Sequence, residues 1–474
     1  MKPLFPFRKT CLAIGVIQAL LISPNFAATL VVDSVGESDS ACSLRNALES
    51  INTLENVGGC NAVGEFGDND VVTFAVSQVS GLETELLISN DVSINPSGSR
   101  VVISANPNTN NRVLAIRNSS VEIENVTITG GRAGLIDGGG IVARDCQLSL
   151  VDVDLIDNTT DGDGGGLYLS DSEGFITNSR ISNNSADDGG GINSRDSNLT
   201  ITNSVISSNR TESSRTGGDD GGGIFATRGF VSITNSTISD NNSEDDGGGI
   251  HATQSTLTLS NITVSGNNAG GTGGGINIFF QSNASMIHST VSNNDSESPF
   301  GGAISVTGST LDLSNSLVVG NRATGSSFLA VSEIRESAAG GVINFLGRNL
   351  VGDDSNTLAQ AVARPTGAPA LPSSVILATS DSSQAASLAS IINPLDFNDG
   401  ATPTHALVEG SPAIDAATNG FCESSSVNNR DQRNLVRTEF CDIGAFEFGA
   451  TEAVIDPGAI PPILFLLLKG DDEN

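Results

Sequence analysis

The chain has 474 residues, of which 22 are Lys or Arg and 54 are Asp or Glu, so its formal net charge is −32 at pH 7. This surplus of acid excludes nucleic acid as a partner, because phosphates would be repelled, and it disfavours direct docking on anionic lipid. Divalent cations, neutral sugars and basic protein surfaces remain. Aromatic residues make up 4% of the chain, with no Trp and one Tyr, so the core must consist of Ile, Val, Leu and Phe.

Residues 1–28 have the features of a secretion signal. Three basic residues precede a short apolar run, Cys11 to Ile22, and Ala27 or Ala28 offers a small-residue cleavage site. The apolar run is too short to cross a bilayer. We therefore expect an exported protein, secreted or held at the cell surface, with no transmembrane span.

Residues 29–70 are predicted to form an N-terminal cap. Ser43 is a candidate N-cap residue for a short amphipathic helix that reaches Ile51 and would cover the open end of the next segment. In an oxidising compartment two local cysteine pairs are expected, Cys42 with Cys60 and Cys422 with Cys441. Cys146 is then left over, and we expect it to be a small buried core residue.

Residues 71–352 carry a repeat. A Gly-Gly-Gly or Gly-Gly-Ala motif recurs at intervals of 26, 25, 32, 26, 26 and 28 residues, and the long interval holds an extra polar run, Thr211 to Thr216. A fixed period in this range predicts a solenoid. The motifs begin at Gly138, Gly164, Gly189, Gly221, Gly247, Gly273 and Gly301. Such glycines suit a tight corner that needs positive φ or close backbone approach.

A second column repeats in step with the glycines. Its residues end an Ile-Ser-Asn-Asn-like segment in each repeat: Asn184, Asn209, Asn241, Asn267, Asn294 and Asn321. We expect left-handed corner residues whose side-chain amides bond to the same amide one coil away. Apolar and polar residues alternate between the two columns, which predicts strands. The prediction is an all-β, right-handed parallel β-helix, a monomeric rod with coils about 4.8 Å apart, closed by a helical N-terminal cap and a disulfide-linked C-terminal cap.

An acidic residue precedes most of the glycine motifs. The members of this acid row are Asp137, Asp163, Asp188, Asp220 and Asp246. Carboxylates stacked at strand spacing repel one another, and Ca²⁺ would relieve that repulsion with carboxylate and carbonyl ligands. The row therefore suggests a line of weak Ca²⁺ sites. The alternative is that each Asp is a solvated turn residue of the kind favoured before Gly.

Residues 353–390 are rich in Ala, Ser, Pro and Leu and are expected to form a linker or excursion, and residues 391–448 form a distinct C-terminal module. Its acidic residues are matched by Arg430, Arg433 and Arg437, which predicts a buried ion network that fixes the cap together with Cys422–Cys441; a ligand site is the alternative. The network comprises Asp415, Asp431, Arg433, Arg437, Asp442 and Glu447. The tail, residues 449–474, is expected to pack its apolar run on the last coil.

Three segments carry a resemblance to known proteins. The run from Cys42 to Leu48 resembles the Cys-Ser-Leu-Arg-Glu-Ala segment of bacterial secreted β-helix proteins, with Asn46 where Glu is usual. The repeats are similar to those of chlamydial polymorphic outer membrane proteins, with Ile or Val in place of Phe. Motifs of the C-terminal module look like the bacterial choice-of-anchor Q domain: Thr404–Leu407, Gly410–Asp415, Asp431–Arg433 and Cys441–Glu447. The resemblance implies a right-handed β-helix exported to the cell surface or the medium.

Two functions follow from these features. The first is an adhesin or structural interaction rod that binds glycan or protein, although an expected lack of exposed aromatic side chains weakens sugar stacking. The alternative is a polysaccharide lyase or hydrolase acting along the groove of the β-helix, where Arg144 and Arg195 occupy equivalent positions. The three His residues are expected to be structural. No nucleophile–base motif is present, so no catalytic residue is assigned.

Overall fold

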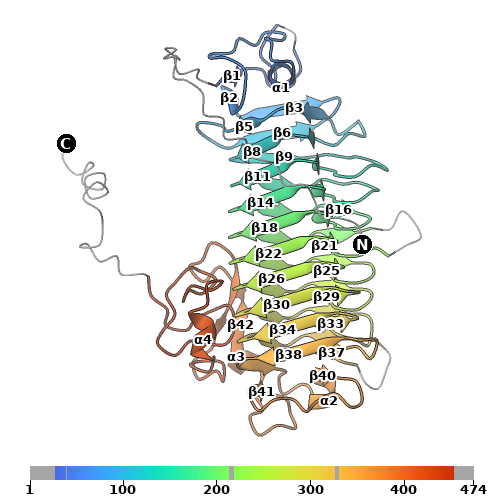
Figure 1. Cartoon of the computed structure of the whole chain (residues 1–474), viewed down its shortest axis with the longest axis vertical. Coiled ribbons are helices and arrows are strands. Elements are labelled where there is room, and N and C mark those ends of the chain that lie inside the picture. Colours follow the sequence, from blue (N-terminus) through green and yellow to red (C-terminus); the bar gives the residue numbers. More distant parts are fainter. Residues whose placement is uncertain (1–26, 39, 213–217, 326–329, 453–474) are drawn as a thin grey trace, which may run out of the picture.

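The computed structural model describes residues 27–38, 40–212, 218–325 and 330–452. Most of the predicted signal sequence, the middle of the extra polar run and the tail beyond Glu452 lie outside this part of the chain. The described residues form an elongated parallel β-helix with a smaller module at its side (Figure 1). The predicted fold class is therefore confirmed. No helix among these residues is long and apolar enough to cross a membrane.

Three long parallel sheets run along the β-helix, and sheets 1 and 2 meet at one corner of each coil. Sheet 1 has twelve strands: β1 (Thr29–Val32), β2 (Asp70–Phe74), β5 (Val92–Ile94), β8 (Ser120–Glu124), β11 (Gln147–Val151), β14 (Glu173–Thr177), β18 (Asn198–Thr202), β22 (Phe230–Thr234), β26 (Thr256–Ser260), β30 (Asn283–Ile287), β34 (Thr310–Ser314) and β38 (Val342–Leu346). Sheet 2 has eleven: β4 (Leu86–Ile88), β7 (Leu114–Arg117), β10 (Ile141–Arg144), β13 (Leu167–Ser170), β17 (Ile192–Arg195), β21 (Ile224–Thr227), β25 (Ile250–Thr253), β29 (Ile276–Phe279), β33 (Ile304–Thr307), β37 (Ile334–Glu336) and β40 (Val362–Ala363).

The remaining strands complete each coil. Sheet 3 has twelve: β3 (Gln78–Leu82), β6 (Val101–Ala105), β9 (Val126–Thr129), β12 (Asp154–Ile156), β15 (Arg180–Ser182), β19 (Val205–Ser207), β23 (Thr237–Ser239), β27 (Thr263–Ser265), β31 (Thr290–Ser292), β35 (Leu317–Val319), β39 (Asn349–Val351) and β41 (Val375–Leu377). The short sheet 4 has six: β16 (Ser185–Ala186), β20 (Arg210–Thr211), β24 (Asn242–Ser243), β28 (Asn268–Ala269), β32 (Asp295–Ser296) and β36 (Arg322–Ala323). The helices are α1 (Leu44–Thr53), α2 (Leu358–Ala361), α3 (Leu388–Ile391) and α4 (Asn419–Cys422), and β42 (Ile392–Asp396) pairs with β43 (Thr404–Leu407).

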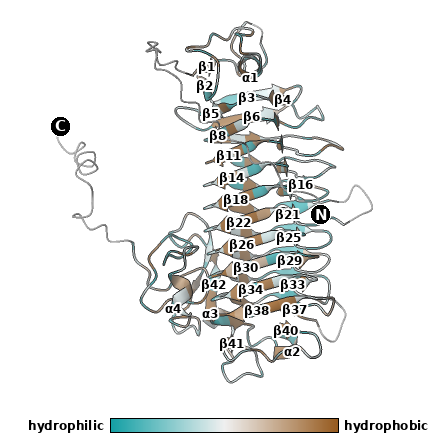
Figure 2. Cartoon of the chain, viewed as in Figure 1, coloured by the Kyte–Doolittle hydropathy of each residue, from teal (hydrophilic) through white to brown (hydrophobic). Residues whose placement is uncertain are grey.

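Alternation within each strand builds the core. In β18 the side chains of Leu199 and Ile201 are buried, and Asn198, Thr200 and Thr202 face outward. Register then stacks like on like, so that Leu199 lies beside Val231 of the next coil. The result is a set of apolar columns inside the coil with polar side chains outside. Figure 2 shows hydrophobic and hydrophilic residues interspersed along the strands as brown and teal segments. Burying these columns against their neighbours is the main driving force for stacking.

The corners follow one rule that the sequence analysis did not find. A residue with positive φ turns the chain, and the next residue accepts a hydrogen bond from the previous coil. At the corner between sheets 2 and 1, Asp196 has φ 50°, and Ser197 Oγ accepts from the backbone N–H of Ser172 at 3.1 Å. The corner between sheets 1 and 3 repeats the device, with Ser204 Oγ accepting from Ser179 N–H at 3.1 Å. Side-chain oxygens thus satisfy backbone donors that the strand ladders leave unpaired.

The asparagine column occupies the corner between sheets 3 and 4. Each side-chain amide donates to the amide oxygen of the next coil at 2.8–3.2 Å, in the series Asn158, Asn184, Asn209, Asn241, Asn267, Asn294 and Asn321. Asn158 begins the column, and the buried carboxyl of Glu333 ends it, accepting from Asn321 Nδ2 at 2.6 Å. The expectation that these residues are themselves left-handed is wrong. The positive φ belongs to the preceding residue, such as Asn183 at 57° or Asp240 at 55°, because the ladder side chain must point inward.

The glycine motif closes the coil between sheets 4 and 2. Gly189 has φ 62°, and a Cβ added to Gly165 would lie 2.6 Å from the carbonyl oxygen of Ser185. The first glycine therefore supplies the left-handed turn, and the second permits close approach of the neighbouring backbone. Both reasons given for glycine from the sequence apply, at different positions of the motif.

The N-terminal segment is part of the β-helix as well as its cover. Helix α1 begins after the N-cap residue Ser43, whose hydroxyl accepts from Asn46 N–H at 3.2 Å, and its Leu44, Leu48 and Ile51 join the core of the first coils. The disulfide Cys42–Cys60 closes this segment. Strand β1, however, pairs in parallel with β2. The sheets therefore start within residues 29–70, because the alternating Thr29–Val32 can present Leu30 and Val32 to the core.

The predicted linker, residues 353–390, is also built into the solenoid. Strand β40 pairs with β37, and β41 pairs with β39, which adds a further, irregular turn. Residues 353–390 lack the repeat motifs, so the sequence did not indicate that they continue the sheets. Val362 and Val375 are buried in the main core, so a few apolar residues suffice to extend the sheets.

The C-terminal module lies along the side of the β-helix, over sheet 3, rather than across its end (Figure 1). Gln432 bridges two strands: its Oε1 accepts from Thr263 Oγ1 at 2.7 Å, and its Nε2 donates to Thr237 Oγ1 at 2.9 Å. His405 Nε2 lies 2.9 Å from Ser265 Oγ. An apolar cluster that includes Leu317, Val319, Ile443 and Phe446 fills the interface. Residues of the predicted anchor-type motifs therefore serve as docking contacts.

Candidate functional site

The acid row lies at the glycine corner, where each carboxylate is partly used by the next coil. Asp188 Oδ1 accepts from the backbone N–H of Asp220 at 3.0 Å, and Asp220 Oδ1 accepts from Asp246 N–H at 3.0 Å. At one end Arg144 pairs with Asp137 at 2.6 Å. These contacts give the row a structural role at the corner. Its five predicted members are aligned as expected, and Ca²⁺ binding along the row stays a prediction.

Burial perturbs the acid row at its centre. It raises the pKa of Asp188 to about 8, with the neighbouring carboxylates Asp163 and Asp220 adding to the shift. The pKa of Asp220 is raised to about 7, again chiefly by burial and then by Asp246 and Asp245. Two adjacent coils thus hold carboxyl groups whose negative charge is poorly compensated, which is the electrostatic condition that favours a proton or a cation there.

His251 stands beside this part of the row. It belongs to the outward-facing register series of sheet 2 that runs Asn193, Phe225, His251 and Asn277 on successive coils. The glycine corner folds over this series, and only 3% of the His251 surface is exposed. Its Nδ1 lies 3.6 Å from Asp220 Oδ1, and its ring stacks on Phe225 at 5.3 Å between centroids. Burial lowers the pKa of His251 to about 4.

Asn277 completes the cluster. Its Nδ2 donates to Asp246 Oδ2 at 2.9 Å and lies 3.5 Å from His251 Nδ1, while its Oδ1 is buried and has no hydrogen-bond partner among the described residues. From the sequence His251 is expected to be structural, and Asn277 has no assigned role. Their positions one period apart on adjoining strands were the available signal.

A second candidate lies at the corner between sheets 2 and 1, as a hollow of about 650 Å³. Two exposed polar columns form its walls. One is the series of turn residues Asn118, Asp145, Asp171 and Asp196, and the other is the first residue of successive sheet 1 strands, Ser120, Gln147, Glu173 and Asn198. The hollow is therefore a groove that runs along the axis across several coils.

The two ends of this groove differ. Asp91 lies at its N-terminal end. Towards the C-terminus Arg228 occupies the next turn position and holds Asp196 with two hydrogen bonds of 2.7 Å. The next residue of the strand column is Phe230, which pairs in register with Asn198 and is 62% exposed. The expectation that aromatic side chains are not exposed is wrong, because Phe at outward strand positions of a narrow coil has no layer to cover it.

Cys146 forms part of the floor of the groove. It stands in the serine column of this corner: Ser172 Oγ accepts from Cys146 N–H at 3.0 Å and lies 3.6 Å from its Sγ. The thiol is half-buried rather than fully buried, so the expectation of a core residue is only partly right. Burial raises the pKa of the thiol, which keeps it protonated and unreactive at neutral pH.

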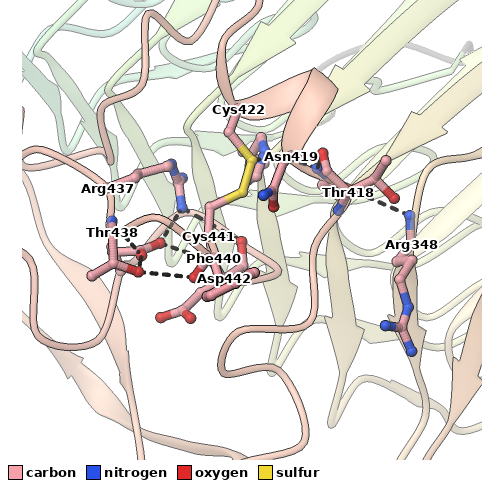
Figure 3. The surroundings of a disulfide bond; sticks show 12 residues. Arg348, Thr418, Asn419, Cys422, Arg437, Thr438, Phe440, Cys441 and Asp442 are labelled. Carbon is pink, nitrogen blue, oxygen red and sulfur yellow. Dashed lines mark hydrogen bonds and ion pairs between the residues drawn. A yellow bond between two sulfur atoms is a disulfide. The ribbon is translucent and has the colours of Figure 1, made fainter.

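The C-terminal module contains the predicted disulfide and most of the predicted ion network. Figure 3 shows the disulfide with Arg437 and Asp442 beside it. Arg437 and Glu447, both fully buried, pair at 3.0 Å, and Arg433 pairs with Asp431 at 2.6 Å. Asp442 accepts from the backbone N–H of Asp415 at 2.7 Å. Asp415 contributes this backbone donor and points its carboxylate to solvent, since it stands at a turn with φ 53°. The network also reaches the β-helix, where Arg437 donates to Asn261 Oδ1 at 3.1 Å.

Arg144 and Arg195 do occupy equivalent register positions, but each is engaged with an acid of its own coil, Asp137 and Asp196 respectively. The other two histidines, His288 and His405, are buried. The contact of His251 with Asp220 lies under the glycine corner, because only 3% of the His251 surface is exposed, and a large substrate cannot reach it there.

Comparison with known proteins bears on the fold. A family model described as "Right handed beta helix region" matches residues 115–349. This match agrees with the fold, which is a right-handed parallel β-helix. Among solved structures it is similar to that entitled "Crystal structure of pectate lyase Pel9A", at 12% sequence identity and a TM-score of 0.44, over 88% of this chain and 96% of that chain. A similarity at this level carries no conclusion about this chain. No curated protein matches the sequence.

Proposed function

We propose that this β-helix is an exported interaction rod that binds a hydroxyl-rich polymer, a neutral or amino-sugar glycan, without chemical turnover. The observation that carries the proposal is the groove between the two polar columns, about 650 Å³ in volume and continuous over several coils. Because its walls repeat in register, a polymer with regular hydroxyl groups meets polar acceptors at corresponding positions on each coil.

The composition of the groove selects the class of glycan. Carboxylates at Asp145, Asp171 and Glu173 accept hydrogen bonds from sugar hydroxyls and attract ammonium groups, whereas a uronic acid would be repelled. The exposed ring of Phe230 at one end offers a face on which a sugar ring can stack. Export and surface location follow from the predicted signal sequence and from the resemblance to secreted β-helix proteins, and both belong to the proposal.

Binding of the mature chain to an array of neutral, amino-sugar and acidic glycans, with and without Ca²⁺, tests the proposal. Phe230→Ser and Asp171→Asn alter the groove without disturbing the coil, because Phe230 is exposed and Asn adopts the left-handed conformation of residue 171 as readily as Asp. Phe397→Ser, at a similarly exposed Phe of the C-terminal module, is the matched control.

We expect binding to neutral or amino-sugar glycans that Phe230→Ser and Asp171→Asn weaken and Phe397→Ser leaves unchanged. Unchanged binding by both groove variants would overturn the groove assignment, and binding to protein ligands alone would replace glycan by protein as the partner. Formation of unsaturated or shortened sugar products would establish the alternative, a polysaccharide lyase or hydrolase. A requirement for Ca²⁺ in binding would support the predicted cation sites of the acid row.

A further inference from the structure

We propose that Asp220, Asp246, His251 and Asn277 form a binding site for one first-row transition-metal ion, with Zn²⁺ as the reference ion, which ties three consecutive coils together. The site is separate from the glycan groove, since it lies at the glycine corner over sheet 2. It also differs in kind from a line of Ca²⁺ sites, because it requires the one coil in which an imidazole adjoins the acid row.

The geometry of three donor atoms already approaches that of a metal centre. One carboxylate oxygen each from Asp220 and Asp246 and a ring nitrogen of His251 all lie within 4.8 Å of one another. Asp220 Oδ1 and His251 Nδ1 are 3.6 Å apart. Tetrahedral Zn²⁺ with bonds of about 2.0–2.1 Å requires ligand atoms about 3.3 Å apart. The donors of Asp220 and His251 are already close to this separation, and the Asp246 oxygen, within 4.8 Å of both, has to move nearer by side-chain rotation.

Asn277 is a separate observation that points to a ligand. Only 1% of its surface is exposed, and its Nδ2 donates to Asp246 and approaches His251. The acceptors Asp246 Oδ2 and His251 Nδ1 beside this amino group would attract a cation. In this orientation of the amide, the buried Oδ1 has no hydrogen-bond partner among the described residues. If the Asn277 amide is rotated by half a turn, Oδ1 instead of Nδ2 faces Asp246 Oδ2 and His251 Nδ1. Three acceptor atoms then point at one another, which is unfavourable unless a cation lies between them. A bound ion thus supplies the partner that Oδ1 lacks.

The donor set selects the class of metal. It combines an imidazole nitrogen with carboxylate and amide oxygens, and imidazole suits Zn²⁺, Ni²⁺, Cu²⁺ and iron. Ca²⁺ instead takes six to eight oxygen ligands, and the two carboxylates here are partly occupied by backbone donors: Asp220 Oδ1 by Asp246 N–H and Asp246 Oδ1 by Thr272 N–H. Zn²⁺ or Co²⁺ is therefore expected to bind in preference to Ca²⁺.

The ligands come from three coils, which defines the consequence of binding. Asp220 precedes β21, Asp246 precedes β25 and His251 lies in it, and Asn277 belongs to β29. An ion held by all of them cross-links consecutive turns of a solenoid whose stability depends on the contacts between neighbouring repeats. Binding to the folded state alone then raises the unfolding midpoint.

The sulfur atoms of Cys422 and Cys441 and a ring nitrogen of His288 lie within 4.8 Å of one another, so free thiols there could also bind metal. The test is therefore titration of the metal-free mature chain with Co²⁺ and Zn²⁺ under non-reducing conditions, which keep the two cysteines paired. Visible absorption of Co²⁺ reports imidazole coordination, calorimetry gives the stoichiometry, and melting with and without Zn²⁺ reports the cross-link. We expect one ion per chain and an upward shift of the midpoint that excess Ca²⁺ does not reproduce.

Variants for this test can be taken from the register series itself. His251→Phe introduces the residue found at 225, and Asn277→Ser introduces the residue found at 305, so both fit the surrounding coil. Altering an outer-shell group commonly weakens metal affinity by about 10–100-fold, so loss of the His251 ligand should cost at least that much. Asp163→Asn, in the same row but without a neighbouring imidazole, is the control and should bind as the wild type does.

Absence of one-to-one Co²⁺ and Zn²⁺ binding would overturn the proposal. So would undiminished affinity in both His251→Phe and Asn277→Ser, or an equal loss in Asp163→Asn, which would indicate adventitious binding to a charged surface. Because the readouts are metal affinity and melting, failure here leaves the glycan-binding proposal untouched.

Discussion

Replacing Asn241 by Ala interrupts the asparagine column at its centre and tests how the corners hold consecutive coils together. The side chain is 1% exposed and takes part in four hydrogen bonds. Its Nδ2 donates to Ile206 O at 3.0 Å and to Asn267 Oδ1 at 2.8 Å, and its Oδ1 accepts from the backbone N–H and from the Nδ2 of Asn209, both at 3.0 Å.

The magnitude follows from which groups lose a partner. Asn209 Nδ2 still donates to Ile181 O, and Asn267 Oδ1 still accepts from the backbone N–H of residue 241. The backbone N–H of Asn209 and the carbonyl of Ile206 lose the side-chain partner that Asn241 supplies. At about 1–3 kcal/mol for each buried group left unsatisfied, the substitution should lower the free energy of unfolding by about 2–6 kcal/mol.

Guanidinium unfolding followed by circular dichroism measures this loss, and hydrogen exchange of the Asn209 and Ile206 region shows whether it is confined to the adjoining coils. Asn242→Ala is the matched control: this neighbouring side chain is exposed, and its removal should change stability by less than about 0.5 kcal/mol. If Asn241→Ala were as stable as Asn242→Ala, the column would be a consequence of stacking rather than a cause of it, and the reasoning would be refuted.

Three further predictions concern other parts of the molecule. Burial raises the pKa of Glu333 well above its ordinary 4.5, so its stabilising effect is full below pH 4.5 and is lost as the pH rises; Glu333→Gln should melt higher than the wild type near pH 7 but not near pH 4, and an equal change at both would contradict this. Ser119 precedes Cys146 in the serine column, and its buried Oγ has no hydrogen-bond partner among the described residues. Cys146→Ser puts a hydroxyl at the next position of this column, so melting should be unchanged or higher; a marked loss would show that the thiol packs as a core residue. Arg437→Met leaves the buried Glu447 unpaired and should destabilise the C-terminal module by about 3–5 kcal/mol, seen as early proteolysis of residues 391–452; full protection would refute the buried pair.

The sequence alone determined the solenoid because its contacts are periodic. Each residue of a coil contacts its equivalent one repeat later, as Leu199 contacts Val231 and Asn209 contacts Asn241. Such contacts are visible in the sequence as similar residues that recur once per repeat. The glycine motifs and the asparagine column could be found from this recurrence. The two disulfides could be predicted for a different reason, since each closes a short segment. Ser119 and its equivalents escaped notice because serine is frequent throughout the repeats.

Tertiary structure decided what the repeat cannot encode. Gln432 and Thr237 are 195 positions apart, and nothing in either segment indicates that the module lies along sheet 3 instead of across the open end. The cluster of Asp220, Asp246, His251 and Asn277 likewise depends on the glycine corner folding over an outward row of sheet 2. That fold brings Asp220 against His251 of the next coil, and Asp246 against Asn277 of the coil after its own. These placements depend on how each coil closes and on which face of the β-helix has apolar surface left to cover. A pattern along the sequence indicates neither the closure of the coil nor the covered face.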